Sequence, residues 1–195
     1  RYKIQNVALL SKIIDYLSIN MSQIFSGKSI ANFLKSENRE CSKESLYNYL
    51  LFICSSCIAD KVPRYDIQGK KVLSTFDKYY LADVSLARIH SVKIDIGASL
   101  ENIVYNELKC RGYEVYIGAL KNAEVDFVAQ KGNEKLYFQV CYILADETTV
   151  EREFGAYKNV KDNFPKYVLS VDKFDFSQDG IIHKNIIDWL LEPHS

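Results

Sequence analysis

Three polar segments in the second half of the chain hold residues that could together bind a divalent metal ion. Glu101 falls in a helical pattern, Glu124 and Asp126 open a predicted strand, and Gln139 follows Asp126 by 13 residues on the next strand. If a tight turn joins these two strands, position 139 lies near position 126. Gln139 and Cys141 then point to the same face, because side chains alternate along a strand. Oxygen ligands of this kind suit Mg²⁺, so Glu101, Glu124, Asp126 and Gln139 are candidate metal ligands.

The elements that must position these residues follow from the hydrophobic periodicity. Leu100, Val104 and Leu108 mark a helix that ends at Gly112. The next elements are strands at 114–120, 125–130 and 136–144, a helix at 147–160 with a Thr148 to Glu151 capping box, a strand at 167–171, and a final helix at 186–191 capped by Asn185. The second half is therefore expected to be an α/β (α+β) domain with the order α-β-β-β-α-β and a closing helix.

With this order, residues 97–195 resemble the PD-(D/E)XK fold of restriction-endonuclease-like proteins. In that superfamily a helix Glu, a strand Asp and the acidic member of the next strand's Glu-x-Lys hold one or two divalent metals, and the Lys helps to position the attacking water. The resemblance assigns Glu101 and Asp126 to the two acids, Gln139 to the place of the second-strand acid and Cys141 to the place of the Lys. Glutamine brings no charge and a neutral cysteine cannot act as a cation, so the motif is degenerate. Glu124 is a candidate substitute ligand.

Three interpretations of this cluster stay open. It could hydrolyse DNA with a divalent metal held by Glu101, Asp126 and Gln139, it could bind a ligand without catalysis, or it could be a polar cluster that ties the helix to the sheet. The degenerate motif favours a site without catalytic activity. Arg152 could in addition pair with the acidic cluster from the following helix.

The first half has the element order of a winged helix. Helices are expected at about 6–18, at about 29–34 and after a Ser42 cap, followed by strands at 58–65 and 71–76 that form a hairpin. In such domains the third helix enters the major groove of DNA and the hairpin contacts the backbone. The candidate DNA-binding residues are Lys43, Asn48, Lys61, Arg64, Lys70 and Lys71. Winged helices also act as protein-contact modules, so a pure interaction role is the alternative.

Two short motifs in the first half are expected to be structural. Gly27-Lys28-Ser29 ends like a phosphate-binding loop, but Ser22 stands where that loop needs a glycine and no strand precedes it. The segment is therefore expected to begin the second helix, with Ser26 or Gly27 as its cap. Cys54 and Cys57 have no second cysteine pair, which favours two small residues on a buried helix face over a zinc site.

Composition and charge limit the classes of protein. The formal net charge is zero, but residues 1–96 carry 14 Lys or Arg and 9 Asp or Glu (+5), and residues 97–195 carry 11 and 16 (−5). Nucleic-acid binding is therefore expected in the first half. No apolar run reaches the roughly 20 residues of a membrane helix, and the five cysteines suit reduced, buried thiols, so a cytoplasmic protein without membrane contact is expected. The expected division is a winged-helix domain (1–78), a connector (79–96) and a nuclease-like domain (97–195).

Several longer strings resemble the uncharacterised domain that follows the ATPase module in a large prokaryotic AAA+ family. They include KYYLADVSLAR, DIGASLENIVYNELKCRGYEVYIG and TVEREFGAY. The resemblance implies an upstream ATP-binding module as a partner in the same chain. It also implies that a glutamine at this position of the motif is typical of the family. Oligomeric assembly is left open. The chain begins at Arg1 rather than at a methionine, as a piece of a longer protein would. The expected function is a DNA-associated accessory region of such an ATPase, with no cofactor of its own except a possible Mg²⁺.

Overall fold

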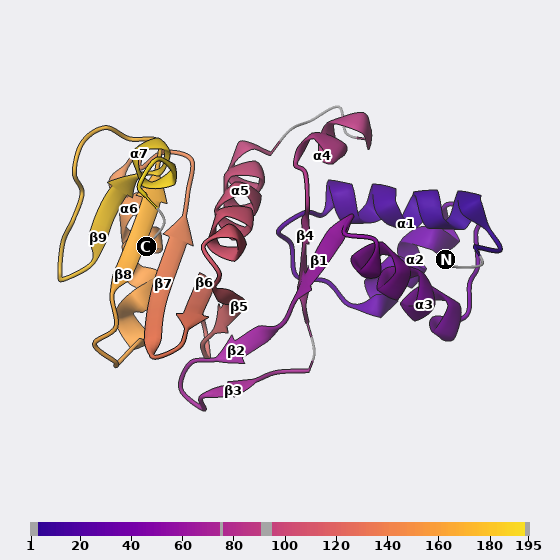
Figure 1. Cartoon of the computed structure of the whole chain (residues 1–195), viewed down its shortest axis with the longest axis horizontal. Coiled ribbons are helices and arrows are strands. Elements are labelled where there is room, and N and C mark those ends of the chain that lie inside the picture. The colour runs from indigo at the N-terminus through magenta and orange to yellow at the C-terminus, as the bar shows by residue number, and fades with distance from the viewer. Residues whose placement is uncertain (1–3, 75, 91–94, 194–195) are drawn as a thin grey trace. The chain divides into compact units, whose positions relative to one another are not determined.

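The computed structural model describes residues 4–74, 76–90 and 95–193 and divides into two compact units. The first unit comprises residues 1–62 and 75–95, and the second comprises residues 63–74 and 96–195. Figure 1 labels the elements of both. The structure is a mixture of helices and sheets, which confirms the α/β class expected from the sequence. No helix among the described residues is both long and apolar enough to cross a membrane.

The first unit contains four helices and two paired strands among its described residues. They are α1 (Val7–Ile19), α2 (Gly27–Ser36), α3 (Lys43–Ser55), β1 (Ala59–Val62), β4 (Lys78–Leu81) and α4 (Ser85–His90). Strands β1 and β4 are antiparallel, with Ala59 opposite Leu81 and Val62 opposite Lys78. The core includes Ile13, Ile30, Leu34, Leu46 and Tyr80, each with at most 1% of its surface exposed.

The helix starts of the first unit are set by side-chain caps. The side chains of Asn6, Ser26 and Ser42 each accept a hydrogen bond from the backbone N–H three residues further along, which satisfies a donor that the helix itself cannot pair. Because Ser26 caps α2 and a helix precedes it, Gly27-Lys28-Ser29 is the first turn of a helix, as the sequence predicted. The apolar stripe predicted for α3 is confirmed up to Ile53.

The second unit is a seven-stranded mixed sheet with helices on both faces. Its strand order is β3-β2-β5-β6-β7-β8-β9. The elements are β2 (Arg64–Asp66), β3 (Lys71–Val72), α5 (Ile96–Cys110), β5 (Glu114–Ala119), β6 (Glu124–Lys131), β7 (Glu134–Val140), α6 (Glu147–Gly155), η1 (Ala156–Asn159), β8 (Lys166–Ser170), β9 (Ile182–Asn185) and α7 (Ile186–Leu190). Strands β5, β6 and β7 are antiparallel neighbours, whereas β8 runs parallel to β7 and β9 parallel to β8. The predicted order α-β-β-β-α-β is confirmed from α5 to β8, whereas β2, β3 and β9 are additional strands that the sequence did not predict for this unit.

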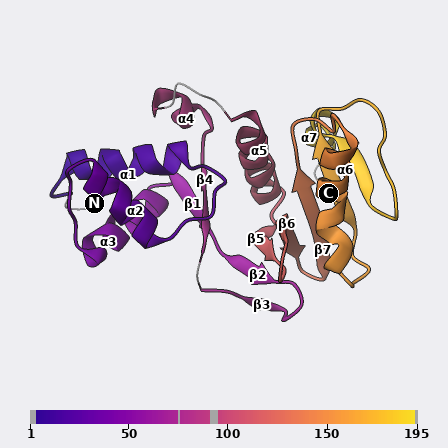
Figure 2. The ribbon, with the colours of Figure 1, turned by 180° about the vertical axis from the view of Figure 1, so that it is seen from behind.

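Alternate side chains of the central strands pack against different helices. On one face, Phe127 lies 6.2 Å from Tyr105 of α5 and Phe138 lies 5.5 Å from Trp189 of α7, measured between ring centroids. On the other face, Val128 and Tyr137 share a buried cluster with Phe154 of α6, Tyr157 of η1 and Tyr65 of β2. Helix α5 is in front of β5 and β6 in Figure 1, and α6 is in front of β7 in Figure 2. We call these the α5 face and the α6 face.

The hairpin predicted for the first half differs from the observed pairing. Strand β1 pairs with β4, whereas β2 and β3 pair with each other and β2 joins β5 of the second unit in parallel. Pro63 separates β1 from β2, because it has no N–H for the β1 ladder. Its carbonyl accepts instead from Ile117 N–H of β5 at 3.0 Å. Burial of Tyr65 and Ile67 in the second unit's core then holds this segment there.

Three further expectations differ from the structure. The segment predicted to begin a connector at residue 79 is the buried strand β4, and only residues 91–94 of the connector lie outside the described part. Cys57 lies beyond the end of α3, is exposed and has a φ of +55°, so it is not on a buried helix face. Of the five free cysteines, only Cys141 is buried. Helix α6 is capped by Asp146, whose carboxylate accepts from Thr149 N–H at 2.7 Å, rather than by Thr148.

Candidate functional site

Asp126 and Gln139 lie opposite each other where the β6–β7 ladder ends. The register runs from Lys131 opposite Glu134 to Phe127 opposite Phe138. Beyond this point, side chains bridge the two strands: Asp126 N–H donates to Gln139 Oε1 at 3.2 Å, and Val140 N–H donates to Asp126 Oδ2 at 2.8 Å. The predicted proximity of positions 126 and 139 is confirmed. Both side chains thus accept a backbone hydrogen bond from the opposite strand at the end of the ladder.

A β-bulge in β6 changes the direction of the side chains before it. Tyr116 of β5 lies opposite Val128, but Gly118 lies opposite Val125, so β6 uses one residue more than β5 over this interval. The extra residue falls at positions 126–127. It interrupts the two-residue alternation between Glu124 and Asp126, so their spacing no longer places both carboxylates on one face. Glu124 is opposite Ala119 at the start of β6.

Cys141, at the position of the motif lysine, is a buried neutral thiol. Burial is the main reason that the pKa of this thiol rises to about 12, and the negative charges of Glu153, Asp172 and Asp126 add to the rise. At neutral pH the group therefore carries no charge. It cannot take over the electrostatic role that a lysine has beside a reacting phosphate.

Helix α6 brings a buried carboxylate to this region. Glu153 is only 3% exposed, and its Oε1 accepts from Nε and Nη2 of Arg152 at 2.9 and 2.6 Å. These bonds and the charge of Glu153 are the main causes of a raised pKa of Arg152. Arg152 thus pairs locally with its neighbour Glu153, and its side chain is 71% exposed. Glu153 was not predicted, although its spacing from Val150 and Tyr157 places it on the packed side of the helix.

The side chains as arranged do not fit a metal ion. Glu101 lies on α5, three residues before the buried Val104 and therefore on the sheet-facing side of that helix. Within the described residues, which include Glu101, Glu124 and Asp126, no three His, Cys, Asp or Glu side chains are grouped so that they could hold a metal. An Asp126 oxygen and the Gln139 oxygen also already accept backbone hydrogen bonds.

A second polar cluster, which the sequence did not reveal, joins β8, β9 and the loop between them. Ser170 Oγ donates to Asp172 Oδ2 at 2.7 Å and lies 2.9 Å from His183 Nε2. Phe176 N–H lies 3.4 Å from His183 Nδ1. Ser170 is fully buried, so its hydroxyl is not accessible to a substrate as that of a nucleophilic serine must be. The cluster therefore holds the 171–181 loop against the sheet.

This cluster predicts a loss of stability in acid. Burial is the main cause of a lowered pKa of His183, so the unfolded chain binds this proton more readily than the folded chain. The contribution of His183 is present above its unfolded pKa of about 6.5 and is lost as the pH falls through the folded pKa. An unfolded histidine has a pKa of about 6.5. Below this pH we expect the unfolding free energy of the protein to fall more steeply with falling pH than that of the His183→Gln variant. Denaturant unfolding at a series of pH values checks this, and identical slopes for both proteins would refute it.

The structure divides the candidate DNA-binding residues between the two units. Lys43 and Asn48 are exposed on α3 of the first unit, with Lys43 Nζ 5.9 Å from the centre of the Tyr47 ring. Lys61 is in the first unit as well, where its Nζ lies 2.9 Å from Asp77 Oδ2. The other three, Arg64, Lys70 and Lys71, belong to the second unit. Lys70 and Lys71 are exposed, whereas Arg64 is half-buried.

Comparison with known proteins finds similarity to uncharacterized proteins. No protein-family model matches the chain. A Haemophilus influenzae protein is 33% identical to it over 195 residues, which cover 98% of this chain and 48% of that protein. A Methanocaldococcus jannaschii protein is 34% identical over 168 residues, which cover 83% of this chain and 37% of that protein. The chain thus spans half or less of the length of these curated relatives, and both are described only as uncharacterized.

Proposed function

We propose that this chain is the C-terminal accessory region of an AAA+-type ATPase, that it associates with double-stranded DNA, and that its nuclease-like second unit binds or assembles without cleaving. The observation that carries the proposal is the bridge between β6 and β7, in which Asp126 and Gln139 accept backbone hydrogen bonds from the opposite strand. The residues at the positions of a nuclease motif thus form hydrogen bonds that join β6 to β7.

The charges of the cluster support a site without hydrolytic activity. Metal-assisted phosphodiester cleavage needs a cation held beside an anionic phosphate and stabilisation of the charge that develops. Gln139 supplies no charge, and the Cys141 thiol stays protonated at neutral pH. Loss of a charged transition-state contact typically costs about 10²-fold or more in rate. Two such losses in one site leave little activity.

The relatives are long enough to support the ATPase part of the proposal. More than half of each relative lies outside the region similar to this chain. That length leaves room for an ATP-binding module, which the resemblance of the sequence implies.

The first unit supports the DNA part of the proposal. Its three helices followed by two antiparallel strands are compatible with a winged helix, in which the third helix enters the major groove. Lys43, Tyr47 and Asn48 are exposed on that helix. A lysine and an amide side chain exposed on this helix are suited to phosphate and base-edge contacts.

One experiment tests binding and cleavage together. Supercoiled plasmid or a short duplex is incubated with the protein and Mg²⁺ or Mn²⁺, and products are resolved on native and denaturing gels. We expect a shift that weakens with salt, intact DNA, and several-fold weaker binding by Lys43→Ala/Asn48→Ala, with Lys35→Ala of α2 as the matched control. Nicking that disappears in Asp126→Ala would show a working nuclease. No shift at low salt would instead favour a protein-interaction module.

A further inference from the structure

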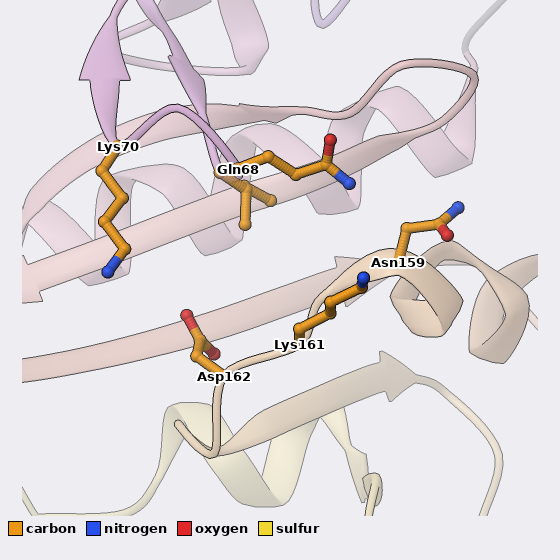
Figure 3. Close-up of a pocket in the computed structure, with 6 residues that line it drawn as sticks. Gln68, Lys70, Asn159, Lys161 and Asp162 are labelled. Carbon is orange, nitrogen blue, oxygen red and sulfur yellow. The ribbon is translucent and has the colours of Figure 1, made fainter.

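A cavity of about 420 Å³ lies in the second unit between the β2–β3 turn and the loop that follows η1. Ile67, Gln68 and Lys70 form one wall, and Asn159, Lys161 and Asp162 form the other. Figure 3 shows Lys70 and Asp162 pointing toward one another from opposite walls, with Gln68, Lys161 and Asn159 toward the other end of the cavity. Its volume lies in the range of small-ligand sites.

The cavity has an excess of positive charge. Lys70 and Lys161 are exposed, and neither ammonium group forms an ion pair within the described part of the chain. The one acid of the lining, Asp162, is already engaged by neighbours of its own: Tyr137 Oη donates to its Oδ2 at 2.6 Å, and Lys135 Nζ lies 3.9 Å from the same oxygen. The other oxygen of this carboxylate, Oδ1, is buried and has no hydrogen-bond partner among the described residues. With two lysines and one carboxylate, the lining carries a net charge of +1.

Both walls are held in place before any ligand arrives. Asp66 Oδ1 accepts from the N–H groups of Gln68 and Gly69 at 3.1 and 2.9 Å, and a Cβ at Gly69 would come 2.3 Å from Asp66 Oδ2. On the other wall, Lys166 Nζ donates to the carbonyls of Asp162 and Phe164 at 2.7 and 3.1 Å. Because the turn and the loop are ordered in this way, binding loses less conformational entropy.

We propose that this cavity binds a phosphate group of a DNA strand, with Lys70 and Lys161 as the cationic contacts and the amides of Gln68 and Asn159 as hydrogen-bond donors. Two ammonium groups and two amides around one hollow match the charge and the acceptor oxygens of a phosphodiester. The inference rests on the proposed association with DNA. It gives the second unit a DNA contact of its own, although its sequence from residue 97 onward is net negative.

The test measures binding of a fluorescent duplex to the whole chain at several salt concentrations. For Lys70→Ala/Lys161→Ala we expect about tenfold weaker binding and a fall of about 0.9 per lost contact in the slope of log affinity against log salt. Lys109→Ala is the control, because Lys109 is exposed on α5, which covers the opposite face of the sheet. Inorganic phosphate and deoxyadenosine monophosphate, added as competitors, distinguish a free phosphate ligand from a DNA strand.

The outcomes separate this inference from the proposed function. If Lys70→Ala/Lys161→Ala binds the duplex with unchanged affinity and slope while Lys43→Ala/Asn48→Ala loses binding, the cavity assignment is overturned and DNA association stands. If neither the parent protein nor any of the variants binds the duplex, the proposed function fails and the inference fails with it. If the two small phosphates bind the cavity as tightly as the duplex does, the ligand is a free phosphate compound and the DNA assignment is overturned.

Discussion

Tyr65→Ala is expected to destabilise the second unit by about 3 kcal/mol and to leave the first unit unchanged. Tyr65 comes only two residues after Pro63, in a stretch whose pattern suggests the wing of the first domain. Its ring is 9% exposed, however, and lies in the α6-face cluster, 5.8 Å from the ring of Tyr116 in β5. Removing a buried aromatic side chain loses its transfer free energy and leaves a cavity.

Amide hydrogen exchange followed residue by residue measures this effect in each unit separately. The amides of β5 and β6 should lose protection in Tyr65→Ala, while those of α1 and α3 keep theirs. Tyr79→Ala is the matched control, since Tyr79 is 7% exposed in β4 and stacks on Phe25 of the first unit at 5.1 Å between ring centroids. It should produce the reverse pattern. Loss of protection in α1 and α3 upon Tyr65→Ala would assign the β2–β3 hairpin to the first unit after all.

The local features of the fold were predictable because local residues determine them. Ser42 and Asn185 were identified as helix caps from their residue type and position, and both accept the expected backbone hydrogen bonds. Gly112 was identified as a helix terminator, and its φ of +83° is the left-handed conformation that glycine adopts most easily.

Strand partners were less predictable, since periodicity gives the face of a strand but not its neighbour. The run from Ile58 to Tyr65 looks like one strand, and only Pro63 within it indicates a break. The strand β9 was missed, because four residues that begin with Ile182 and include three polar side chains give little apolar alternation. It is held by its parallel pairing with β8, from which the 171–181 loop separates it in the sequence.

The candidate site was predicted in part for the same reasons. A tight turn between two strands fixes which residues lie opposite each other, so the pairing of Asp126 with Gln139 followed from the spacing. The bulge at positions 126–127 and the burial of Glu153 depend on how β5 and α6 pack against β6. Neither has a signature in the spacing of the motif.

The sign of the stability change in Asp126→Ala distinguishes a structural bridge from a metal site. We expect this substitution to lower the unfolding free energy by about 2 kcal/mol, because Val140 N–H loses a charged acceptor at 2.8 Å. Asp126→Asn keeps an acceptor oxygen at the same position and should lose less. Gln139→Ala removes the acceptor of Asp126 N–H, and the double variant should show coupling between the two positions, which share one hydrogen-bonded strand end.

A metal site would behave in the opposite way. Its carboxylates repel one another without the metal, so that replacing one of them stabilises the metal-free protein at the expense of function. The metal would also raise the unfolding temperature by mass action, since it would bind only the folded chain. We therefore expect millimolar Mg²⁺ or Mn²⁺ to leave the unfolding temperature of the protein unchanged, as in Asp126→Ala. A metal-dependent rise that Asp126→Ala abolishes, together with a metal-free Asp126→Ala protein more stable than the parent, would show that these oxygens are ligands rather than strand-bridging acceptors.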